Sequence, residues 1–201
     1  MLAACCAYGQ GTLVYDQQSV TTDTAGSGPP YDIQPNQPIG QSFTPTLSSV
    51  GFIGVNMRDE NPGNSLGATV YLDLWSSSIG GTFLGSTDPI SMPDGYGSYG
   101  YDPRTGVTYF FFSTPISVTP GVTYYFQPMV ESGGDIWGIS GYHFFYAGGE
   151  IFVKGTDDPN FDLWFREGVV PEPSSAALIL IGMTAFYFRN RKTQQSTTKE
   201  L

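Results

Sequence analysis

The sequence predicts an all-β protein built as a two-sheet antiparallel sandwich of the jelly-roll type. Between residues 10 and 168, Tyr, Phe, Val and Thr are abundant, as is typical of strands. The chain also contains 26 Gly and 15 Pro, which break these stretches into short segments and indicate frequent turns. Before residue 174, no window keeps the apolar spacing of a helix over a helical length. Many short strands form sandwiches or barrels, and a closed barrel is the alternative fold.

Eight segments combine strand-forming residues with turn signals at their ends. They are 12–16, 40–44, 49–58, 69–76, 107–113, 122–130, 149–154 and 161–166. Successive side chains of a strand point to opposite faces, so two of these strands can be divided into an inner and an outer set. The side chains expected in the core are Val70, Leu72, Leu74, Phe161, Leu163 and Phe165. The side chains expected on the outer faces are Tyr71, Asp73, Trp75, Asp162, Trp164 and Arg166.

The C-terminal residues combine three features in a fixed order. A short proline-rich motif comes first, an almost wholly apolar run over 176–188 follows, and a basic cluster comes last. The motif consists of Pro171, Glu172 and Pro173, and the basic cluster contains Arg189, Arg191 and Lys192. Over 169–192, this order resembles the PEP-CTERM sorting signal of Gram-negative bacteria. The resemblance implies export, followed by recognition and processing by an exosortase.

The apolar run is expected to form a C-terminal hydrophobic helix that anchors the protein in the inner membrane. Its 13 residues span about 20 Å as a helix, so flanking residues must help to cross the bilayer. The basic cluster is expected to stay in the cytoplasm, with the polar tail 193–201, while residues 10–168 form an ectodomain outside. After processing, the protein would reach the cell surface or the extracellular space. The alternative is a buried core helix followed by a surface charge cluster.

The N-terminal residues 1–9 include the small residues of a signal-peptide cleavage region but lack a basic start and a full apolar core. We expect them to be the remnant of a signal peptide whose upstream part is missing because the start codon was assigned too late. The alternative is a lipoprotein motif ending at Cys5. Cys5 and Cys6 are the only cysteines, and adjacent residues do not meet the geometry of a disulfide. The ectodomain is therefore expected to fold without cross-links.

Residues 10–168 carry 16 acidic against four basic side chains, a formal charge of −12. Such a surface repels phosphate backbones, so no nucleic-acid partner is expected. One acidic stretch is dense enough to consider calcium, which prefers several oxygen ligands from a loop. Its residues are Asp157, Asp158, Asn160 and Asp162. An ordinary polar turn is the alternative and the simpler interpretation, so we expect no cofactor.

No combination of residues points to catalysis. His143 is the only histidine, and it lies within an aromatic run where packing is its expected role. No Gly-x-Ser-x-Gly motif presents a nucleophile, so a Ser-His-Asp triad is not indicated. The 95–100 segment has Gly-x-Gly-x-x-Gly spacing but no strand-helix-strand context. Paired carboxylates for glycoside hydrolysis stay open, because their separation is set in three dimensions.

The aromatic residues give the one positive indication of a ligand. Sugars stack on exposed aromatic rings, and jelly rolls often serve as carbohydrate-binding modules. The candidate residues are Trp75, Trp137 and Trp164. The alternative is that these rings pack against neighbouring strands. We therefore expect an exported, non-enzymatic protein of the cell surface or extracellular matrix; the alternatives are a carbohydrate-binding module and a glycoside-active enzyme.

Overall fold

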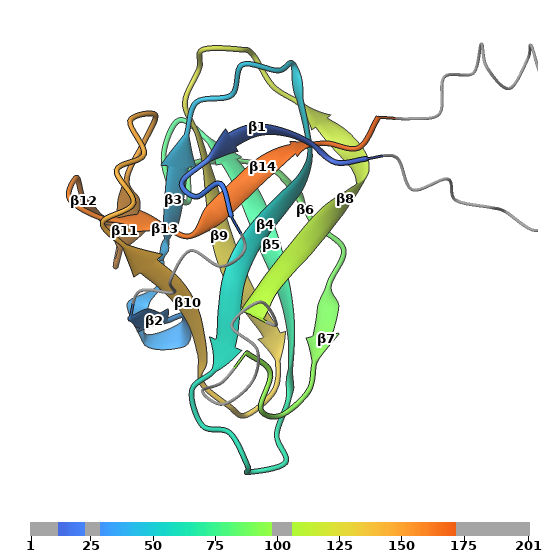
Figure 1. Cartoon of the computed structure of the whole chain (residues 1–201), viewed down its shortest axis with the longest axis vertical. Helices are drawn as coiled ribbons and strands as arrows, with labels where there is room; N and C mark the ends of the chain where they lie inside the picture. The colour runs from blue at the N-terminus through green and yellow to red at the C-terminus, as the bar shows by residue number, and fades with distance from the viewer. Residues whose placement is uncertain (1–11, 23–28, 98–105, 172–201) are drawn as a thin grey trace, which may run out of the picture. The chain divides into compact units, whose positions relative to one another are not determined.

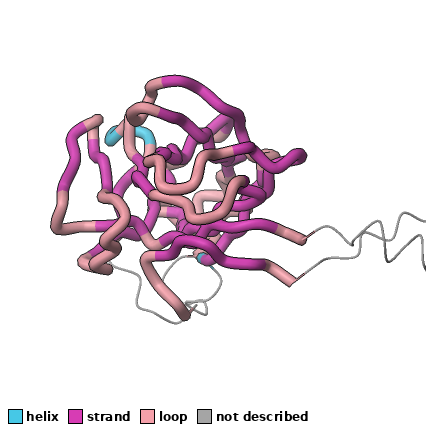
Figure 2. The backbone as a smooth tube through the Cα atoms, turned by 90° about the horizontal axis from the view of Figure 1, so that it is seen from above, coloured by secondary structure: helices cyan, strands magenta, loops and turns pink. Residues whose placement is uncertain are grey.

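The computed structural model describes residues 12–22, 29–97 and 106–171. In these ranges the chain is all-β, with two antiparallel sheets packed as a sandwich (Figure 1). The described strands lie within one compact unit, Val14–Val169. A short 3-10 turn, η1 (Gln34–Asn36), lies between the strands Pro30–Asp32 and Gly40–Phe43, and strands account for much of the traced backbone (Figure 2). The predicted sandwich is thus confirmed, whereas residues 1–9 and the predicted C-terminal helix and tail lie outside the described residues.

The first sheet is organised around the long strand β4 (Ser49–Asp59). It pairs with β8 (Val107–Ser117), with β14 (Phe165–Val169) through residues 52–55, and with β10 (Trp137–Tyr142) through residues 57–59. β1 (Val14–Gln18) pairs with β14. The short strands β2 (Pro30–Asp32) and β13 (Asp162–Leu163) both pair with β10.

The second sheet runs in the order β12, β11, β3, β9, β5, β6, and β7 also pairs with β5. Its strands are β12 (Thr156–Asp158), β11 (Ile151–Val153), β3 (Gly40–Phe43), β9 (Tyr124–Ser132), β5 (Ala68–Ser76), β6 (Thr82–Ser86) and β7 (Ile90–Met92). The longest pairing joins residues 69–76 of β5 to β9. Neighbours in this sheet are therefore often distant in sequence, as in a sandwich rather than a simple meander.

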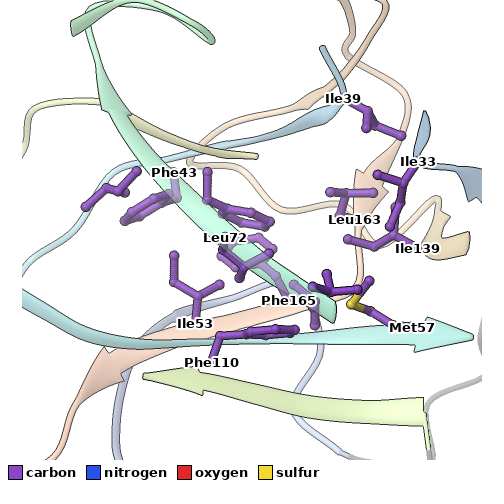
Figure 3. Close-up of a cluster of buried hydrophobic side chains, with 14 of the residues drawn as sticks. Ile33, Ile39, Phe43, Ile53, Met57, Leu72, Phe110, Ile139, Leu163 and Phe165 are labelled. Carbon is purple, nitrogen blue, oxygen red and sulfur yellow. The ribbon is translucent and has the colours of Figure 1, made fainter. Parts of the chain in front are cut away.

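The core lies between the two sheets, where large apolar side chains from both sheets meet (Figure 3). Phe110 and Phe165 of the first sheet and Phe43 and Leu72 of the second are fully buried. Phe165 lies 6.4 Å from Phe43 and 5.5 Å from Phe126 between ring centroids. The core positions predicted for the strand at 69–76 are confirmed, because Val70, Leu72 and Leu74 are fully buried.

The last strand differs from the prediction in two ways. The expected strand 161–166 is two strands, β13 and β14, separated at Trp164, whose N–H donates to the Ser140 carbonyl. Trp164 is fully buried and Arg166 is 5% exposed, although both were expected to face outward into solvent. The reason is that residues from near the N-terminus cover this face. Arg166 Nε donates to the Val20 carbonyl, and the Arg166 guanidinium lies over the rings of Trp164 and Tyr15.

Five strands had no counterpart among the predicted segments: β2, β6, β7, β10 and β12. All five are three to six residues long, and four of them contain Pro, Gly or Asp, which have low strand propensity. The pairing partner stabilises them instead. Gly138 and Ile139 of β10, for example, pair with β4 as well as β2.

Candidate functional site

The outer face of the second sheet carries aromatic side chains from four strands. Residues directly opposite in an antiparallel pair share a face, and Trp75 is opposite both Phe83 of β6 and Tyr125 of β9. Phe152 of β11 continues this line beyond β3, with its ring centroid 5.5 Å from that of Tyr125. The centroids of Trp75 and Phe83 are 5.3 Å apart. We call these four residues, Phe83, Trp75, Tyr125 and Phe152, the aromatic row.

The aromatic row is accessible from solvent. Phe83 is 53% exposed, and the other three rings are half-buried. The row crosses from β6 to β11 over four strand spacings, so the backbone positions of Phe83 and Phe152 lie about 19 Å apart at about 4.8 Å per strand. Both close ring pairs are edge-to-face, with interplanar angles of 65° and 71°. The rings support one another in this geometry, which is favourable for aromatic pairs.

Polar side chains lie beside the aromatic row, two residues further along the same strands. Asp73 of β5 is opposite Gln127 of β9, and both are 8% exposed. The Ser86 hydroxyl donates to Asp73 Oδ1 at 2.5 Å, and Gln127 Nε2 donates to Gln37 Oε1 at 2.5 Å. Gln37 in turn donates to the Pro128 carbonyl. These hydrogen bonds fix the orientation of the polar groups next to the rings.

This face is acidic. Asp73, Glu131 and Asp157 occupy outward positions of β5, β9 and β12, whereas the strands of the second sheet contain no Arg or Lys. Burial raises the pKa of Asp73, and the Ser86 hydrogen bond opposes that effect. Tyr71 lies near the same acids: burial first, and then the charges of Asp73 and Glu131, raise the pKa of its hydroxyl.

The three tryptophans predicted as sugar-binding residues have different positions in the structure. Trp75 belongs to the aromatic row, but Trp137 and Trp164 are fully buried and have no ring face available to a ligand. Trp137 belongs to the hydrophobic core, and Trp164 lies 4.9 Å below the Arg166 guanidinium. Their prediction as ligand-binding residues is corrected on this ground. The sequence pattern missed Phe83, Tyr125 and Phe152, because only strand pairing brings these rings next to Trp75.

The acidic stretch considered for calcium does not gather its oxygen atoms around one point. Asp162 is buried, where its carboxylate accepts hydrogen bonds from Gln41 Nε2 and the Tyr146 N–H. Asp158 Oδ1 accepts from the Asn160 N–H, as in an ordinary polar turn, and Asp157 is exposed on β12. In the three described ranges, no group of three or more His, Cys, Asp or Glu side chains could hold a metal ion.

His143 is held by packing and by one hydrogen bond to the backbone. Its Nδ1 donates to the Asn160 carbonyl at 2.5 Å, and its ring centroid is 4.1 Å from that of Phe161. The ring of Phe145 stacks near the same imidazole at 6.2 Å. No Ser, Thr or carboxylate side chain is hydrogen-bonded to this imidazole in the described part of the chain, so its contacts match the predicted packing role.

Comparison with protein-family models gives no match for this sequence, and comparison with curated proteins finds none that is significantly similar. The resemblance of 169–192 to a sorting signal therefore stays a prediction. Pro171 is described, but Glu172, Pro173, Arg189, Arg191 and Lys192 lie outside the described residues. Within 12–22, 29–97 and 106–171, no helix is long and apolar enough to cross a membrane.

Proposed function

We propose that this chain is an exported, non-enzymatic protein of the cell surface or extracellular matrix that binds extracellular polysaccharide through the aromatic row. We also assign its sandwich to the jelly-roll class, in which carbohydrate-binding modules are frequent. The resemblance to a PEP-CTERM signal supports export, inner-membrane anchoring and release through an exosortase. Partners would thus be the exosortase and the membrane at the C-terminus, and a glycan at the sandwich.

The aromatic row is the observation that carries the glycan-binding part of the proposal. Four rings from four strands of the second sheet form a strip whose end residues have backbone positions about 19 Å apart, long enough to contact several units of an extended chain. Asp73 and Gln127 add fixed hydrogen-bonding groups beside it. A ligand site of this kind needs apolar faces with a few oriented polar groups, and this surface offers both.

A glycan array probed with the full chain in mild detergent tests the proposal. We expect binding to at least one class of polysaccharide, and we expect Trp75→Ala to weaken it about tenfold or more. Phe111→Ala is the matched control, because Phe111 is 40% exposed but lies on β8 of the other sheet. An equal loss in both variants, or no binding by the wild type, would contradict the proposed site.

The enzyme alternative is separated by a second measurement on the same glycans. Reducing-sugar release should stay at the level of a blank without protein, because binding by the aromatic row leaves the glycosidic bonds intact. Release that depends on Asp73 or another carboxylate would replace the non-enzymatic function with a glycoside-active one.

A further inference from the structure

We propose that the aromatic row selects a polysaccharide that carries free amino groups, and that the Asp73 carboxylate binds the positively charged ammonium group of a sugar unit. This inference rests on the proposed function and names the class of its ligand. A hexosamine polymer with unsubstituted amines is the chemistry that fits. The argument comes from the rings, from the position of one carboxylate and from the charge of the whole face.

The rings favour a cationic ligand over an anionic one. The face of an aromatic ring attracts a cation, and Trp is the strongest of the three aromatic residues in this respect. Trp75 lies near the centre of the row, between Phe83 and Tyr125. An ammonium group on a sugar that stacks on Trp75 would thus gain from the ring in addition to the stacking.

Asp73 places a carboxylate at the distance where such an ammonium would need it. Asp73 and Trp75 are two residues apart on β5, so they share the outer face at a spacing of about 7 Å along the strand. The Ser86 hydroxyl holds Oδ1 of Asp73, which fixes the carboxylate next to the row. The side chain is 8% exposed, and a charge-assisted hydrogen bond is stronger where water is largely excluded.

The charge of the surrounding surface acts in the same direction. Glu131 and Asp157 add two further carboxylates to this face, and the strands of the second sheet contain no Arg or Lys, with Lys154 in the turn between β11 and β12 as the basic side chain near its edge. A polymer of uronic acids would bring its carboxylates against these acids and be repelled. A neutral polymer would use the rings but leave the acidic groups without a charged partner. A polymer with free amines complements both parts of the surface.

Titration calorimetry of the full chain in mild detergent, at pH 6 and low salt, tests this inference with three hexasaccharides. They are the hexamer of glucosamine, the hexamer of N-acetylglucosamine and cellohexaose. We expect the glucosamine hexamer to bind about tenfold more tightly than the other two, a difference of about 1.4 kcal/mol. This preference should shrink as salt is added, because exposed charges are screened.

Two substitutions separate a local charge site from the net charge of the chain. Asp73→Asn keeps the shape of the side chain and should bring the three affinities to within about twofold of one another. Asp157→Asn makes the same change of charge about four strands away and should leave the preference for glucosamine intact. Equal effects of the two substitutions would overturn the role of Asp73.

The outcomes also distinguish this inference from the proposed function. If the three hexamers bind equally and Trp75→Ala weakens them all, glycan binding stands and the preference for amines is wrong. If none of them nor any glycan on the array binds, both fail. Trp75→Phe, which keeps a ring on the same strand, should restore part of the affinity and shows that a loss in Trp75→Ala is not due to unfolding.

Discussion

Glu167 offers the most direct test of the energetics of this fold. It lies on β14, opposite Ile53 of β4 and Gln17 of β1, and it is fully buried. Neither carboxylate oxygen has a hydrogen-bond partner among the described residues. Burial first, and then the charge of Asp16, raise the pKa of Glu167 to about 9; the Gln17 N–H opposes this shift without reaching hydrogen-bond geometry. The folded protein therefore holds this carboxyl protonated at neutral pH.

The sign of the effect on stability follows from the two pKa values. The ordinary value is 4.5 and the folded value is about 9, so the native state keeps a proton that the unfolded state has lost between these limits. The contribution of Glu167 is fully present below pH 4.5 and is lost as the pH rises toward 9. The loss is about 1.4 kcal/mol per pH unit, or about 3 kcal/mol between pH 5.5 and pH 8.

Glu167→Gln removes the titration while burying a polar group of the same size. The free energy of unfolding of this variant, relative to that of wild type, should thus rise by about 3 kcal/mol from pH 5.5 to pH 8. The amide itself changes the stability by an amount that is the same at both pH values, so it does not affect this difference. Thermal unfolding in mild detergent measures it as a relative shift of about 6–12 °C. Glu131→Gln, at an exposed position of β9, is the control that makes the same substitution outside the core. A difference between Glu167→Gln and wild type that is the same at both pH values would refute the reasoning.

Three further results are expected. Phe165→Ala should lower the free energy of unfolding, measured by chemical denaturation, by about 3–5 kcal/mol because it removes a fully buried ring. Phe145→Ala, at an 86% exposed position, should change it by about 0.5 kcal/mol or less. Thermal scans in calcium should give the same midpoint as scans in sodium at matched ionic strength, since Asp162 is turned inward from the 157–162 turn; a rise specific to calcium would revive the metal site. Intact-mass measurement of the surface-associated protein from a host with an exosortase should find the chain ending near 171–173, and recovery of full-length protein alone would argue against the sorting signal.

The fold class follows from local patterns, and the structure confirms it. Alternation in the strand at 69–76 correctly predicted Val70, Leu72 and Leu74 in the core, because the pleat of a strand fixes which side chains share a face. The same rule placed Phe165 in the core. Local patterns also predicted a polar turn around Asp158 and Asn160, since such side chains bond to backbone two residues away.

The candidate site could be predicted only in part. Trp75 was correctly expected on an outer face, but the pattern of one strand does not say which residues lie opposite. Pairing with β6 and β9 places Phe83 and Tyr125 beside Trp75, although Tyr125 is 50 positions away in the sequence. The register between distant strands is set by the packing of the whole sheet, so a row across four strands has no signature in any one of them.

Trp164 shows the other limit of local reasoning. Alternation assigned it and Arg166 to the face opposite the core, but it could not show whether that face meets water. The Val20 carbonyl and the Tyr15 ring cover this part of the sheet, so both side chains are buried. The sequence by itself thus determined the sandwich and the inner faces of its clearest strands. Only the tertiary structure decided which outer faces are exposed, because burial depends on segments that the chain brings back from elsewhere.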